Sequence, residues 1–113
     1  MNGQMKETKG TIDFLDYEYA AECGMPCRVR FLHDRIRIRW EEEGETGPGT
    51  ELVEYLGTDL GHGHYELSCP ARGGKATLHG FPGARLLVGD LFENGQRGMW
   101  RVCLFSDETG GDE

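Results

Sequence analysis

The sequence predicts an all-β protein, a small antiparallel meander of seven to eight strands that forms a closed or partly open β-barrel, with a β-sandwich as the alternative. Short runs alternate apolar and polar residues, whereas no long stretch shows the helical period of about 3.6 residues. Eighteen glycines in 113 residues favour frequent turns. Two stretches also form hairpins in which apolar residues face one another, and closing the meander would remove exposed strand edges.

The first of these hairpins covers residues 27–40, CRVRFLHDRIRIRW. A two-residue loop at His33-Asp34 gives a register with three apolar pairs on one face: Phe31 with Ile36, Val29 with Ile38, and Cys27 with Trp40. The same register places arginines on the other face: Arg30 opposite Arg37, Arg28 opposite Arg39, and Arg35 at the turn. Like charges directly opposite one another destabilise a sheet, so this face requires anions nearby.

The other strands are predicted from short alternating runs between turn signals. They cover residues 11–19, with a bulge near Phe14-Leu15, and then residues 51–56, 64–69, 74–79, 85–93 and 98–105. Residues 20–26 are interpreted as a connection and residues 57–63 as a glycine-rich turn. The Asn94-Gly95 turn signal predicts a second hairpin in which Gly89 faces Trp100 and leaves room for the indole.

These registers also predict the core and the limits of the domain. The side chains expected to be largely buried are Trp40, Tyr65, Leu78, Leu87, Trp100 and Val102. We expect a flexible N-terminus at residues 1–10, a single β domain at residues 11–105 and an acidic tail at residues 106–113.

The formal net charge is −8, from 12 basic and 20 acidic residues, which argues against general binding of nucleic acid or anionic membrane. The basic residues are unevenly spread, because five of the twelve lie between Arg28 and Arg39. The N-terminal residues lack the apolar core of a signal peptide, so a cytoplasmic location and reduced thiols at the four cysteines are expected.

The arginines of the first hairpin are the main candidate site: Arg28, Arg30, Arg35, Arg37 and Arg39. Guanidinium groups match the geometry of carboxylates and phosphates, so one interpretation is a binding face for an acidic partner protein or a small anionic ligand. The alternative is internal neutralisation by acidic residues of neighbouring strands, namely Asp13, Asp16, Glu18, Glu51 and Glu54.

Histidines form a second candidate site. His62, His64 and Glu66 would share one face of a strand, and the predicted register places His64 opposite His79. Three imidazoles and a carboxylate could bind a divalent metal, with zinc as the expected ion, and a metal-bound water could support hydrolysis. The alternative is that these histidines simply face solvent on the polar side of a sheet.

The sequence thus favours a non-catalytic β-barrel binding module without a cofactor and without catalytic residues. It contains no Gly-x-Ser-x-Gly elbow and no phosphate-binding glycine loop in a strand-loop-helix context. The alternatives are a metal-dependent enzyme and a structural or oligomerising domain. Oligomerisation would use an apolar outer face of the last hairpin, formed by Leu86, Val88, Phe92, Met99 and Cys103.

Overall fold

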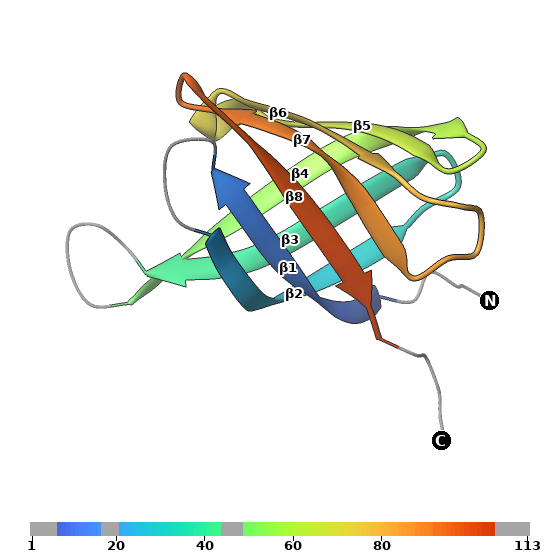
Figure 1. The fold of residues 1–113 in the computed structure, drawn as a ribbon, viewed down its shortest axis with the longest axis horizontal. Coiled ribbons are helices and arrows are strands. Elements are labelled where there is room, and N and C mark those ends of the chain that lie inside the picture. Colours follow the sequence, from blue (N-terminus) through green and yellow to red (C-terminus); the bar gives the residue numbers. More distant parts are fainter. Residues whose placement is uncertain (1–6, 17–20, 44–48, 106–113) are drawn as a thin grey trace.

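The computed structural model describes residues 7–16, 21–43 and 49–105, which form a closed antiparallel barrel of eight strands (Figure 1). Each strand pairs with the next, and β8 pairs with β1. This last pairing confirms the predicted barrel and excludes the β-sandwich. The elements are β1 (Glu7–Asp16), β2 (Ala21–Phe31), β3 (Arg35–Glu43), β4 (Thr50–Gly61), β5 (His64–Cys69), the 3₁₀ turn η1 (Pro70–Arg72), β6 (Gly74–His79), β7 (Leu86–Glu93) and β8 (Gln96–Leu104).

The registers predicted for the hairpins are confirmed, except that the β2–β3 ladder ends at Arg28 and does not include the predicted pair of Cys27 with Trp40. In the β2–β3 hairpin Phe31 faces Ile36 and Arg30 faces Arg37, and the Leu32 amide donates to the Arg35 carbonyl at 2.9 Å. In the β7–β8 hairpin Gly89 faces Trp100. Alternation of apolar and polar residues is sufficient to fix these pairings, because a slip of one residue would expose a whole apolar face.

The N-terminal strand starts earlier than predicted. β1 begins at Glu7, so residues 7–10, assigned by the sequence to the flexible N-terminus, are strand. The register shift relative to β2 lies between Ile12 and Phe14, slightly before the expected bulge at Phe14-Leu15. The remaining parts of the predicted terminus and tail, residues 1–6 and 106–113, lie outside the described residues.

Residues 21–26 belong to β2 and are not the predicted connection. Pro26 cannot donate a ladder hydrogen bond, because proline has no backbone N–H. In the described part of the chain β2 pairs with β3 only from Arg28 to Phe31, so Pro26 has a strand partner, Thr11, on the β1 side alone. A proline is tolerated where the backbone on one side of a strand forms no hydrogen bonds with a neighbouring strand.

Likewise, β4 runs through the predicted glycine-rich turn and ends at Gly61. Gly57 lies opposite Leu67 on β5, and a Cβ at position 57 would overlap the carbonyl oxygen of Glu66. This glycine therefore allows a close approach of two strands rather than a turn. The turn itself is tighter, with His62 and Gly63 in the left-handed region.

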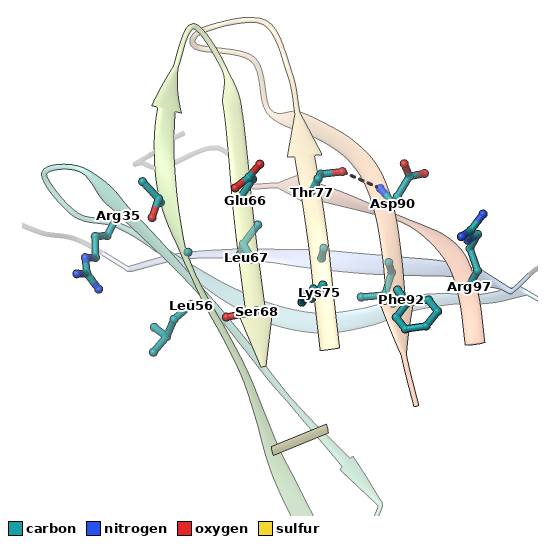
Figure 2. A pocket seen from close by; sticks show the side chains of 14 residues that line it. Arg35, Leu56, Glu66, Leu67, Ser68, Lys75, Thr77, Asp90, Phe92 and Arg97 are labelled. Carbon is teal, nitrogen blue, oxygen red and sulfur yellow. Dashed lines mark hydrogen bonds between the residues drawn. The ribbon is translucent and has the colours of Figure 1, made fainter. Parts of the chain in front are cut away.

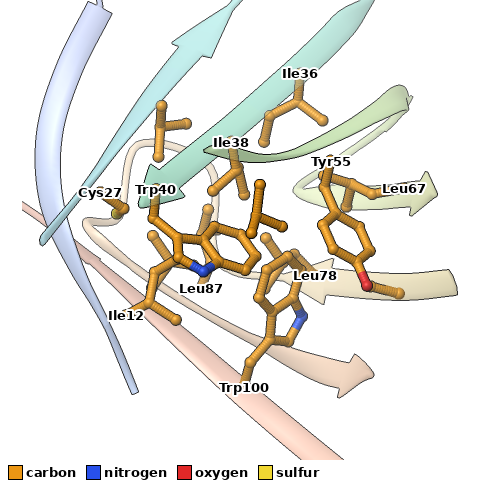
Figure 3. Packing of buried hydrophobic residues seen from close by; sticks show 14 of the residues in the cluster. Ile12, Cys27, Ile36, Ile38, Trp40, Tyr55, Leu67, Leu78, Leu87 and Trp100 are labelled. Atoms are coloured by element: carbon orange, nitrogen blue, oxygen red, sulfur yellow. The ribbon is translucent and has the colours of Figure 1, made fainter. Parts of the chain in front are cut away.

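The barrel interior is filled by side chains, with Trp40, Tyr55 and Trp100 packed together near one end (Figure 3). The Trp100 indole N–H donates to the Thr77 carbonyl at 2.9 Å. Of the side chains predicted to be buried, only Tyr65 is not: it is half-buried near the other end, with its ring against Phe31. Burial of Trp40, Leu78, Leu87, Trp100 and Val102 is confirmed.

Candidate functional site

The outward arginines of the β2–β3 hairpin form two rows with residues of β1. Lys9 on β1 pairs with Arg28, which pairs with Arg39 on β3. Glu7 pairs in the same way with Arg30, and Arg30 with Arg37. We call the surface formed by Arg28, Arg30, Arg37 and Arg39 the arginine face. Its side chains point away from the core because their sequence neighbours Val29, Ile36 and Ile38 are fully buried.

Glu7 is the main counter-ion of the arginine face. Its two carboxylate oxygens accept hydrogen bonds from Nε and Nη2 of Arg39, both at 3.0 Å. The same carboxylate lies 3.8 Å from Nη1 of Arg28 and 3.9 Å from Nη2 of Arg37. The hydrogen bond from Arg39 holds the pKa of Glu7 below its usual value, despite partial desolvation. Sequence reasoning missed Glu7 because it assigned the residue to a flexible terminus.

Of the five predicted counter-ions, one pairs with the arginine face and two pair with other arginines. Glu54 approaches Arg37 at 3.6 Å. Asp13 instead accepts hydrogen bonds from the Gly24 amide and Arg101, which lower its pKa. Glu51 lies near Arg72, 3.7 Å away. The side chain of Asp16 and the whole of Glu18 lie outside the described residues.

The arginine face retains positive charge after this pairing. Among the described residues, only Glu7 and Glu54 have carboxylates within 4.0 Å of its four guanidinium groups. The Nε atoms of Arg30 and Arg37 are buried and have no hydrogen-bond partner in the described part of the chain. Lys9, in the same row as Arg28, adds a further cation. The buried Nε atoms are not accessible to an incoming anion, which would meet the exposed guanidinium group of Arg28 and the exposed ammonium group of Lys9.

Two grooves include arginines of the β2–β3 hairpin. The first, of about 880 Å³, combines the cations Lys9, Arg28 and Arg39 with a single carboxylate, Glu41, and with apolar side chains such as Leu52. The second, of about 890 Å³, has Arg35 at one edge and crosses the outer faces of β4 to β7 (Figure 2). It carries both signs of charge, because Glu66 and Asp90 line it together with Lys75 and Arg97. The first groove is thus the more cationic of the two.

Acid should weaken the fold through the carboxylates held by these pairs. Glu7 and Asp13 have pKa values below their usual values, so their ionisation stabilises the folded state. This stabilisation is fully present at any pH above the pKa values that Glu7 and Asp13 have in the unfolded chain. It is lost as the pH falls through the lower pKa values that they have in the folded protein. We expect the free energy of unfolding, measured by urea denaturation, to decline below about pH 4. Glu7→Gln should make this decline shallower. An unchanged dependence of the free energy of unfolding on pH would show that the Glu7 carboxylate does not stabilise the fold.

The predicted histidine set is only partly brought together. His64 and His79 are directly opposite each other, with 2.7 Å between their Nδ1 atoms, as the predicted register requires. His62 occupies the β4–β5 turn with a left-handed backbone, not a strand position shared with His64. Glu66 faces Thr77 and lines the groove near Arg35. Within the described ranges no three His, Cys, Asp or Glu side chains gather as a metal site.

A further charged network, which the sequence did not indicate, lies at the end of the barrel near η1. Arg72 donates to Glu42 at 2.8 Å and to Glu93 at 3.3 Å. These carboxylates also accept the Trp40 indole N–H at 2.8 Å and the Tyr55 hydroxyl at 2.6 Å. Desolvation and the Glu93 carboxylate raise the pKa of Tyr55. The network satisfies the polar atoms of two core aromatic residues, which is a structural role.

All four cysteines are free. Cys27 and Cys69 are buried and Cys23 and Cys103 are exposed. Burial raises the pKa of the Cys27 thiol to about 12, so that thiol is unreactive.

The apolar outer face predicted for the last hairpin is interrupted by charge. Leu86, Phe92 and Met99 are exposed, and Val88 is half-buried. Between Met99 and Cys103, however, Arg101 forms an ion pair with Asp13 at 2.7 Å. Oligomerisation through this face stays a prediction.

The fold and its surface define a closed eight-stranded β-barrel with a cationic outer face on an acidic chain. Comparison with protein-family models, with curated proteins and with solved structures found no match to this chain. In the described residues no helix is long and apolar enough to cross a membrane.

Proposed function

We propose that this protein is a non-catalytic binding module whose arginine face binds an anionic ligand, either a carboxylate-rich segment of a partner protein or a small phosphate-bearing molecule. The observation that carries the proposal is the imbalance of charge on that face. Four arginines share two carboxylates in the described residues. The buried Nε atoms of Arg30 and Arg37 form no hydrogen bond there, although Nε of Arg37 lies 3.6 Å from the Glu54 carboxylate.

The groove beside Lys9, Arg28 and Arg39 supports this function. Its cations lie on three adjacent strands, so the barrel holds them at fixed spacing before the ligand arrives. A preorganised site loses less conformational entropy on binding than a flexible one. Pro26 and Leu52 line the same groove, so a ligand that combines acidic and apolar groups would contact both kinds of side chain.

Glu7 gives the site an internal competitor. Its carboxylate already accepts two hydrogen bonds from Arg39, as a ligand carboxylate would. Replacing Arg28, whose side chain is 56% exposed, removes a donor that the fold uses little. Substitutions of Arg28 and of Glu7 are therefore expected to change the affinity for an anionic ligand in opposite directions.

The test is titration calorimetry with a hexaglutamate peptide and with inorganic pyrophosphate, each at low and at high salt. Arg28→Gln should weaken binding roughly tenfold or more, and Glu7→Gln should strengthen it. Binding should also weaken as salt rises, because ions screen exposed charges. The control is Arg85→Gln, which removes the same charge from an exposed position of another groove and should leave the affinity unchanged. Equal affinities for Arg28→Gln and Arg85→Gln, or no binding by the wild-type protein, would overturn the proposal.

A further inference from the structure

His64 and His79 form a pair of imidazoles on the outer face of the barrel, on strands other than those of the arginine face. They occupy directly paired positions at one end of β5 and β6, and both side chains are exposed. Their Nδ1 atoms are 2.7 Å apart, and their ring centroids are 4.9 Å apart at an interplanar angle of 67°. Two ring nitrogens thus converge on one point of the surface.

We propose that His64 and His79 bind a divalent transition-metal ion as a bidentate site, with copper(II) preferred. An Nδ1–Nδ1 hydrogen bond requires a proton on one of the two nitrogens. When both rings carry their proton on Nε2, both Nδ1 lone pairs are free to bind a metal ion. At about 2.0 Å from each nitrogen, the ion would lie beside the line that joins them, and both exposed rings would turn to direct their lone pairs at it. The strand ladder already fixes the separation of the two backbones, so chelation orders only two side chains.

The two imidazole ligands favour copper(II) over zinc through the general affinity order of the divalent ions. At metal–nitrogen distances of about 2.0 Å, adjacent corners of a square-planar site are roughly 2.8–2.9 Å apart, whereas tetrahedral positions are roughly 3.3 Å apart. The observed separation of 2.7 Å is that of a hydrogen bond between the two rings, and a small movement of the exposed side chains reaches either value. Square-planar nitrogen sites suit copper(II) and nickel(II), and copper(II) binds most tightly of the divalent first-row ions.

The pair leaves coordination positions open. In the described ranges no third His, Cys, Asp or Glu side chain completes the set, so water or a group from another molecule would occupy the other positions. The predicted third histidine, His62, lies in the neighbouring turn. A site of this kind would exchange its metal readily and could bridge to a donor on a partner.

The experiment is calorimetric titration of untagged protein with copper(II), nickel(II) and zinc(II) chloride. Because exposed thiols are oxidised by copper(II), the titrations use a Cys23→Ser/Cys103→Ser background. We expect one equivalent of copper(II) to bind, with affinity falling from copper to nickel or zinc. His64→Gln or His79→Gln should each weaken binding roughly 100-fold, because a bidentate site becomes monodentate. The matched control is His33→Gln, at an exposed position in the β2–β3 turn, which should bind like the parent protein.

A second measurement does not depend on the variants folding. The electron paramagnetic resonance spectrum of the copper-loaded parent should show coupling to two imidazole nitrogens. Coupling to one nitrogen, or undiminished copper binding by a His64→Gln/His79→Gln double variant, would overturn the inference. Loss of binding in His33→Gln or His62→Gln would also overturn it, because another histidine would then be a ligand. Tighter binding of zinc than of copper would overturn the preference for copper.

Discussion

Trp100→Ala should lower the free energy of unfolding by about 3–5 kcal/mol, the cost of removing a large aromatic side chain from a packed core. The indole is 1% exposed and packs against three other aromatic rings, those of Phe14, Trp40 and Tyr55. Its removal would leave a cavity where β3, β4 and β8 meet and would deprive the Thr77 carbonyl of a hydrogen bond. Denaturant unfolding followed by far-ultraviolet circular dichroism measures the change.

Trp100→Phe separates the two contributions. Phenylalanine retains part of the aromatic packing but cannot donate to the Thr77 carbonyl, so a smaller loss is expected, including about 1–3 kcal/mol for the unsatisfied acceptor. A Trp100→Ala protein within about 1 kcal/mol of the wild type would mean that the indole does not fill the core.

Gly89→Ala should destabilise the barrel by about 3 kcal/mol, the upper end of the usual cost of overpacking, although it adds a single methyl group. A Cβ at position 89 would overlap the carbonyl oxygen of Thr77, which belongs to the backbone of β6 and cannot rotate away. The strands β6 and β7 would have to separate, and the Trp100–Thr77 hydrogen bond would lengthen with them. Thermal and denaturant unfolding both test this expectation.

Gly95→Ala is the matched control. Gly95 lies in the β7–β8 turn with φ of 80°, and an added Cβ would meet no atom within 4 Å. Its cost is the left-handed conformation alone, about 1–2 kcal/mol. If Gly89→Ala were no less stable than Gly95→Ala, the close approach of β6 and β7 would not be a real constraint.

The candidate site was predicted in part. The alternation of residues 27–40 placed the four arginines of the arginine face on one surface and in the correct pairs. It could not identify Glu7 as their counter-ion, because Glu7 reaches them only through the pairing of β1 with β2. The distribution of Asp13, Glu51 and Glu54 among different arginines also depends on which strands lie side by side.

The arrangement of the histidines was likewise predicted only in part from the sequence. The spacing of β5 and β6 was sufficient to place His64 opposite His79, because a short loop fixes the register of two neighbouring strands. The exclusion of His62 depends on the end of β4 and on the left-handed turn that follows. Glycine signals were ambiguous there, since Gly57 lies within a strand and Gly63 within a turn.

By itself, the sequence determined the all-β class, the register of its hairpins and the division of most side chains between core and surface. These depend on local alternation and on turn residues, which act between neighbours in the chain. Only the tertiary structure decided the closure of β8 on β1, the start of β1 at Glu7 and the passage of β4 through Gly57. Each of these depends on contacts between strands, whose free energy appears only when the barrel brings distant segments together.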